Sequence, residues 1–216
     1  MKYLKKKDPT KKVARDNFEK QLIVKVRKYL RDDFGKHKWV FNDFLVGSAR
    51  CNLVLVGNEG FDLDYQLRFE KMPENYLNDA KATKELFSRY FNRANSELSL
   101  GLKNCEDSTH VLTMKKIMEG KIVYSYDIAI LRLDANGQYI ILKNEKKQKP
   151  DDYHYVQLAD CTDFNNKYKK INNSKKWDSL REKYKAKKEA FQNTNKYNWP
   201  HSFSLLGQAV NEVLQE

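Results

Sequence analysis

The spacing of apolar positions along the chain changes several times, and these changes predict a protein that mixes helices and strands. From residue 14 to residue 34 apolar side chains recur at helical spacing, and Gly35 ends the run, so we expect a long N-terminal helix. A second helical pattern covers residues 79–98. Short runs rich in β-branched and aromatic residues predict strands at 39–46, 52–56, 61–70, 110–117, 122–134 and 138–144.

The last third of the chain has a different pattern. Residues 145–152 are polar and include Pro150. We therefore expect a boundary there, between a first domain at 1–150 and a second at 151–216. Beyond the boundary the spacing is helical throughout, with helices expected at 162–171, 174–191 and 201–214. The sequence thus predicts an α+β fold, in which a mixed sheet is braced by the N-terminal helix and followed by a small helical lobe.

The composition fits an ordinary globular protein. The chain has 216 residues, of which 40% are hydrophobic and 12% aromatic, enough to bury a sizeable core. No apolar run approaches the ~20 residues that a membrane span needs, and the N-terminus lacks the apolar core of a signal peptide, so we expect a cytoplasmic protein without a membrane partner. Cys51, Cys105 and Cys161 are far apart, which favours reduced thiols.

The net charge of +12 is unevenly distributed. Residues 1–38 and 143–188 each contain 14 lysines and arginines, whereas residues 39–142 contain 12 against 14 acidic residues. Basic flanks around a neutral middle favour a polyanionic substrate, either a nucleoside triphosphate alone or one together with RNA or tRNA. A solvated, lysine-rich surface explains the same pattern equally well.

Two acidic residues stand one position apart in the predicted strand 61–70. Because residues i and i+2 of a strand point to the same face, Asp62 and Asp64 present two carboxylates about 7 Å apart, while Phe61, Leu63 and Tyr65 face the other way. Carboxylates that share a face are suitable ligands for a hard cation such as Mg²⁺ or Mn²⁺.

A Gly-Ser pair follows the predicted strand 39–46. Gly47 allows a close approach of the backbone, and the Ser48 hydroxyl adds a hydrogen-bond donor, which together suit a triphosphate oxygen. Arg50 lies within reach of a phosphate there, or pairs with an acid. We expect nucleotide binding at this turn.

A third acid, Asp127, lies inside the apolar run of residues 122–131. Desolvating a lone carboxylate costs several kcal/mol, at least about 2, unless a partner compensates it. A metal shared with Asp62 and Asp64 would do so, and three such acids with a Gly-Ser turn meet the needs of two-metal phosphoryl transfer.

Gly47-Ser48, Asp62-Leu63-Asp64 and Asp127 resemble the GS…DxD…D signature of the polymerase-β-like nucleotidyltransferase superfamily. The fourteen positions from Ser48 to Asp62 are most similar to the branch of cyclic-GMP-AMP synthase (cGAS), Mab-21 and the bacterial oligonucleotide cyclases (CD-NTases). This resemblance covers roughly residues 15–145. It implies a nucleotidyltransferase core in which the Gly-Ser pair binds the triphosphate, Asp62 and Asp64 bind both metals, and Asp127 binds metal and helps deprotonate the acceptor hydroxyl.

The resemblance weakens in the C-terminal lobe, which is shorter than in those cyclases. Tyr197 and Trp199, before Pro200, either stack on a base or pack between helices, and four lysines nearby offer contacts to a triphosphate. These four are Lys169, Lys170, Lys175 and Lys176. The absence of paired histidines indicates that the zinc-bearing insertion of the animal DNA sensor is missing.

Several functions remain open at this level. The resemblance implies transfer of a nucleoside monophosphate from an NTP to a hydroxyl with release of pyrophosphate, forming a cyclic or linear oligonucleotide signal. The short second lobe and basic flanks favour transfer to RNA, tRNA or a protein instead. A catalytically silent nucleotide- or RNA-binding module, and a purely structural partner, are the alternatives outside enzymology.

Overall fold

The computed structural model describes residues 1–56, 60–145, 152–158, 161–190 and 202–216, apart from the side chain of Phe203. The chain forms two compact units. One consists of Tyr3–Leu158, and the other of Ala159–Glu216 with Met1–Lys2. None of the helices in the described part of the chain has the length and apolar character required to span a bilayer.

The larger unit contains most of the secondary structure. Its elements are α1 (Pro9–Asn17), the π-helical turn η1 (Phe18–Leu22), α2 (Ile23–Phe34), β2 (Val40–Val46), α3 (Gly47–Arg50), β3 (Leu55–Val56), β4 (Phe61–Lys71), α4 (Glu74–Leu77), α5 (Ala80–Glu97), β5 (Glu106–Asp107), β6 (Val111–Met118), β7 (Lys121–Leu133), β8 (Tyr139–Asn144) and β9 (Tyr153–Gln157). A short strand β1 (Lys2–Tyr3) pairs with β3.

The central sheet is mixed, as expected. Its strands follow the order β2-β4-β7-β6-β5, and β8 and β9 extend it from β7. β4 and β7 run parallel, whereas the other neighbouring strands are antiparallel. Strand β7 pairs with β6 through one part of its length and with β8 through another, which places it at the centre of the sheet.

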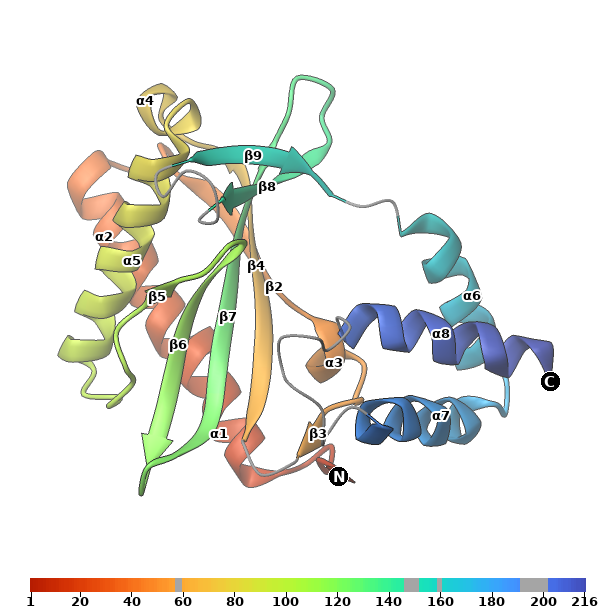
Figure 1. Ribbon diagram of the computed structural model, residues 1–216. Coiled ribbons are helices and arrows are strands. Elements are labelled where there is room, and N and C mark those ends of the chain that lie inside the picture. The colour runs from red at the N-terminus through yellow and green to blue at the C-terminus, as the bar shows by residue number, and fades with distance from the viewer. Residues whose placement is uncertain (57–59, 146–151, 159–160, 191–201) are drawn as a thin grey trace. The chain divides into compact units, whose positions relative to one another are not determined.

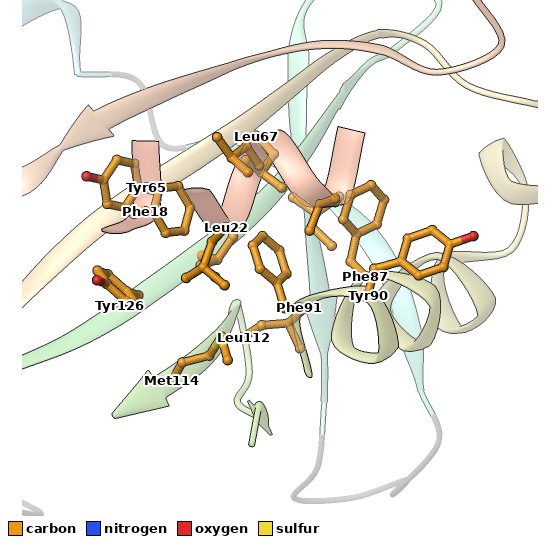
Figure 2. Close-up of a cluster of buried hydrophobic side chains, with 14 of the residues drawn as sticks. Phe18, Leu22, Tyr65, Leu67, Phe87, Tyr90, Phe91, Leu112, Met114 and Tyr126 are labelled. Carbon is orange, nitrogen blue, oxygen red and sulfur yellow. The ribbon is translucent and has the colours of Figure 1, made fainter. Parts of the chain in front are cut away.

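One face of this sheet is covered by the N-terminal helices and α5 (Figure 1). The apolar side chains at alternate positions of the strands face these helices. Phe18 of η1 stacks on Tyr65 of β4 with ring centroids 3.8 Å apart. Figure 2 shows Phe18 among Tyr65, Tyr126 and Phe91. The Tyr126 hydroxyl donates to the carbonyl of Ala14 at 2.7 Å, which satisfies a polar group inside this core. The opposite face of β4 and β7 is therefore left for the polar residues.

The N-terminal helix begins and continues differently from the sequence prediction. It starts at Pro9, where Asp8 caps it by accepting a hydrogen bond from the backbone of Lys11, and it contains a π turn at Phe18–Leu22. Such a turn shifts the register of the apolar positions within one helix. Phe18, Leu22 and Ile23 are all fully buried as a result.

The smaller unit contains α6 (Thr162–Asn172), α7 (Trp177–Ala190) and α8 (Ser202–Gln215). Apolar residues from all three helices form its core, and Lys187 of α7 pairs with Glu212 of α8 at 2.5 Å. The helices thus make a small bundle with its own buried side chains, which are Ile171, Leu180, Tyr184, Leu205, Ala209, Val210 and Val213. That the chain before residue 150 acts as a catalytic lobe, and the chain after it as a helical lobe, stays a prediction.

Two element predictions are wrong in detail. Residues 153–157 were expected in the helical part, but they form strand β9, because Tyr153 and Tyr155 pack against the core of the larger unit. The strand expected at 52–56 is reduced to Leu55–Val56, since residues before it close the turn after α3 through a hydrogen bond from the Leu53 backbone to Ser48.

Candidate active site

The three candidate acids lie on two adjacent strands. Asp62 and Asp64 belong to β4 and Asp127 to β7, and in the parallel register of these strands Asp64 is opposite Asp127 while Asp62 is opposite Ser125. Partners in register share a face, so all three carboxylates occupy the face opposite the helices. The neighbours Leu63 and Tyr65 are buried on the helical side, as period two requires.

The Gly-Ser turn lies directly beside Asp64. Val46, the last residue of β2, is the register partner of Asp64, and Gly47 follows it with a left-handed φ of 64°. A Cβ at Gly47 would overlap the Asp64 carboxylate, with the Asp64 Cγ only 2.9 Å away. Glycine is therefore required here by both the backbone conformation and the lack of space, and the turn forms a cradle against the acid.

Two hydroxyl groups orient the acids. Thr113 of β6 donates to Asp127 Oδ1 at 2.6 Å, and Ser125 of β7 donates to Asp62 Oδ1. Both hydroxyls lie on the same face as the acids, because Thr113 is the register partner of Asp127 and Ser125 that of Asp62. Neither Thr113 nor Ser125 was predicted to belong to the site. The signal that was available is their polar character at alternate positions of apolar strands.

Burial raises the pKa of Asp127 above its ordinary value, and the nearby charge of Asp62 raises it further. The hydrogen bond from Thr113 and the positive charge of Lys115 oppose this shift without cancelling it. Lys115, on β6, is itself paired with Glu106 of β5. The site therefore holds clustered negative charge that a cation would stabilise.

A pocket of about 470 Å³ opens beside Asp62 and Asp127. The loop and strand residues around β5 form one wall, and β6 and β7 form the other. Its lining residues are Asp62, Glu106, Asp107, Ser108, Thr109, Thr113, Lys115, Ile122, Ser125 and Asp127. Gly47, Ser48 and Asp64 do not line this pocket. Gly47 and Ser48 follow β2, which pairs with β4 on the side away from β7.

The β5 wall of this pocket is held by a network of polar side chains. Asp107 accepts hydrogen bonds from Asn144 at 2.9 Å and from Tyr153 at 2.7 Å, and it pairs with Lys84 at 2.6 Å. Burial raises the pKa of Asp107, but these three partners outweigh it and lower the pKa below its ordinary value. Lys84 also donates to the carbonyl of Ser108 at 2.5 Å, so the wall is fixed to α5.

The residues suit Mg²⁺ or Mn²⁺ chemically, since they provide carboxylate oxygens next to a glycine cradle and a carboxyl group whose charge lacks full compensation. Among the described residues, the ligand atoms of the three aspartates are not all within 4.8 Å of one another, so joint coordination requires side-chain rotation. A group that does meet this limit is Glu145, Asp152 and His154, which the sequence analysis did not single out. Glu145 there is already paired with Lys143 at 2.8 Å.

The sequence singles out further residues besides the three acids and the Gly-Ser turn. Arg50 ends α3, and its side chain is exposed. Tyr197 and Trp199 lie outside the described residues. Cys51, Cys105 and Cys161 form no disulfide bond among the described residues.

This fold resembles that of the cGAS-like nucleotidyltransferases, and the expected α+β class with a mixed sheet is confirmed. The similarity is to solved structures of the dinucleotide cyclase DncV. Against the GTP-bound form from Vibrio cholerae the TM-score is 0.57 at 13% identity, over 96% of this chain and 61% of that one. Against the 3'-deoxy GTP-bound form from Escherichia coli it is 0.56 at 16% identity, over 96% and 62%.

A third structure, the Vibrio cholerae enzyme described as a cyclic AMP-GMP synthase and prokaryotic cGAS homolog, gives a TM-score of 0.55 at 16% identity over 98% of this chain and 59% of that one. The chain thus spans about three-fifths of the length of these cyclases. No model of a protein family matches the sequence, and neither does any curated protein. At this level of identity the likeness concerns the fold.

Proposed function

We propose that this protein is a metal-dependent nucleotidyltransferase, which moves a nucleoside monophosphate from an NTP to a hydroxyl group and releases pyrophosphate. The observation that carries this proposal is the common face of Asp62, Asp64 and Asp127, with the Gly47 cradle against Asp64. In the proposed reaction, Gly47 and Ser48 bind the β- and γ-phosphates. Arg50 and Tyr197 remain candidates for further contacts to the nucleotide.

Asp62 and Asp64, together with Asp127, would hold Mg²⁺ or Mn²⁺, which would stabilise the negative charge that develops on the phosphoryl group during transfer. Asp127 has a second role. Because burial raises its pKa, its carboxylate is a stronger base than that of an exposed aspartate, which suits it to take the proton of the acceptor hydroxyl. Thr113 keeps Asp127 oriented for this step through its hydrogen bond.

The likeness to DncV favours a small nucleotide product over a modified macromolecule. Solved structures of that protein contain GTP and the linear intermediate 5' pppA(3',5')pG, at TM-scores of 0.57 and 0.55 to this chain. We therefore propose a second nucleotide as the acceptor. Transfer to RNA, tRNA or a protein is the alternative that the basic segments of the sequence favour.

The test is turnover with each of the four NTPs labelled in turn, with Mg²⁺ or Mn²⁺, and with or without duplex DNA, RNA and tRNA. The double variant Asp62→Asn/Asp64→Asn is compared with Asp32→Asn, which changes a half-exposed carboxylate on α2. Metal-dependent release of pyrophosphate in the wild type and in Asp32→Asn, but not in the double variant, supports the proposal.

The products separate the acceptor classes. A small labelled product identifies a nucleotide acceptor, whereas label on tRNA or on the protein identifies a modifying transferase. If no condition gives a product although NTP and metal bind, the protein is a catalytically silent binding module and the proposed reaction is wrong.

A further inference from the structure

The face of the sheet that carries the three acids continues beyond them as a surface of two rings and a guanidinium group. Gln66 and Arg68 follow Asp64 at alternate positions of β4, so they point to the same face as the acids. Phe44 of β2 is the register partner of Gln66. Tyr139 of β8 lies on the same face. Its register partner is Leu133 of β7, and the register partner of Arg68 is Leu131, two residues earlier on that strand.

Arg68 is fixed between the two aromatic rings. Its Cζ lies 4.7 Å from the centroid of Phe44 and 5.5 Å from that of Tyr139. Gln66 Oε1 accepts hydrogen bonds from Arg68 Nε at 3.0 Å and from a terminal nitrogen at 2.7 Å. These contacts hold the long arginine side chain in one conformation, which reduces the entropy lost when a ligand binds to it.

Phe44 keeps 40% of its surface exposed, on the edge strand β2 of the sheet. Phenyl and guanidinium groups both offer flat surfaces on which nucleobases stack, and such stacking tolerates every base. Gln66 lies one strand repeat beyond Asp64, about 7 Å along β4. The rings and Arg68 are therefore placed where a base would lie if its phosphates were beside Asp64 and Gly47.

We propose that Phe44, Arg68 and Tyr139 form a stacking surface for the base of the substrate nucleotide. This inference rests on the proposed function, since it assumes that the phosphates of an NTP bind at the acids and the Gly-Ser turn. The surface contacts the base through flat groups rather than through a set of hydrogen bonds. It therefore supplies affinity for the nucleoside part without choosing strongly among bases.

The experiment compares NTP binding with binding of inorganic triphosphate, which has no base. Dissociation constants of ATP, GTP and inorganic triphosphate are measured with Ca²⁺, and melting temperatures confirm that each variant folds. Phe44→Ala removes a ring, and Phe44→Tyr keeps it. Arg68→Lys keeps the charge but removes the planar group. Val24→Ala, at a side chain of α2 that is 52% exposed, is the matched control.

We expect Phe44→Ala to bind NTPs about tenfold more weakly, within the range for loss of one stacking contact. Arg68→Lys should have an effect in the same direction. Inorganic triphosphate should bind all variants as it binds the wild type, and Phe44→Tyr and Val24→Ala should bind NTPs normally.

Three results would overturn the inference. If the wild type binds NTPs and both Phe44→Ala and Arg68→Lys bind them equally well, the stacking surface is wrong and the proposed function stands. If the variants lose NTP and triphosphate alike, the substitutions disturb the phosphate site and the base does not lie here. If the wild type binds neither ligand, the proposed function fails and the inference fails with it.

Discussion

Asp64 on β4 and Asp127 on β7 lie directly opposite each other on two neighbouring parallel strands. Hydrogen bonding between the strands fixes this register, so the two acids cannot move apart without breaking the centre of the sheet. Asp62 joins them from the same face, and Gly47 closes the space beside Asp64.

The first prediction concerns the pH dependence of stability. Burial raises the pKa of Asp127 in the folded protein, so the folded state binds this proton more tightly than the unfolded chain does. In metal-free protein, stability should therefore fall as pH rises from the ordinary aspartate pKa, about 4, through the raised value. Asp127→Asn removes this loss and keeps the acceptor for Thr113.

We thus expect metal-free Asp127→Asn to melt at a higher temperature than the wild type at about pH 7, with the difference shrinking toward about pH 3. Asp134→Asn is a control of opposite sign, because hydrogen bonds, first from the Gln138 backbone, lower the pKa of Asp134. That variant should lose stability above the ordinary aspartate pKa. Equal melting temperatures of wild type and Asp127→Asn across this range would contradict the prediction.

The second prediction separates two effects of a side chain at Gly47, the steric overlap with Asp64 and the strain of the left-handed backbone. Gly47 and Gly120 have similar φ values of 64° and 74°, but a Cβ would overlap Asp64 at the first and meet nothing within 4 Å at the second. Alanine at either position should cost about 1 to 2 kcal/mol of stability through the left-handed conformation. Only Gly47→Ala should also lower NTP turnover, by about 10²-fold, because it displaces the carboxylate. Similar turnover in both variants would mean that the cradle plays no part in the reaction.

The third prediction concerns Lys11, a lysine that is only 5% exposed. Its ammonium group donates to the carbonyl of Ala49 at 3.1 Å and thereby joins α1 to the turn that follows Gly47. Lys11→Met keeps the length of the side chain but leaves this carbonyl without the bond, which should cost about 1 to 3 kcal/mol. The affinity for NTP should fall by about tenfold as the turn loses its anchor.

Lys12→Met provides the comparison, because Lys12 is the adjacent residue of α1 and its side chain is exposed. Calorimetric titration with NTP and thermal unfolding should give this variant the affinity and the melting temperature of the wild type. An unaltered NTP affinity in Lys11→Met would show that the contact with Ala49 serves the fold alone.

The fourth prediction concerns the wall of the pocket. Lys84 is 3% exposed and its partner Asp107 is 28% exposed at the side chain. Lys84→Met should destabilise the protein by about 2 to 3 kcal/mol, less than the loss of a partner from a fully buried pair, because Asp107 stays in contact with water. Adding Asp107→Asn should recover part of this loss, as measured by chemical denaturation. A double variant less stable than Lys84→Met would contradict an ion pair as the main interaction.

The apolar periodicity was sufficient to predict much of the sheet. The alternation around Asp62 and Asp64 predicts that they share a face, and the pattern of residues 122–134 predicts the strand that carries Asp127 beside them. The helical spacing likewise identifies Phe18 and Leu22 as core residues. These features depend on local geometry, which the order of residues determines directly.

The sequence alone determined which side chains each strand presents to one face, and hence that two acids, a third acid and a Gly-Ser turn were available for one site. Only the tertiary structure decided which residues meet there, such as Thr113 with Asp127 and Ser125 with Asp62. It also decided that Tyr153–Gln157 is a strand, and that Arg68 lies between Phe44 and Tyr139. The physical reason is that periodicity follows from the local backbone, whereas strand order and register depend on packing between segments far apart in the chain.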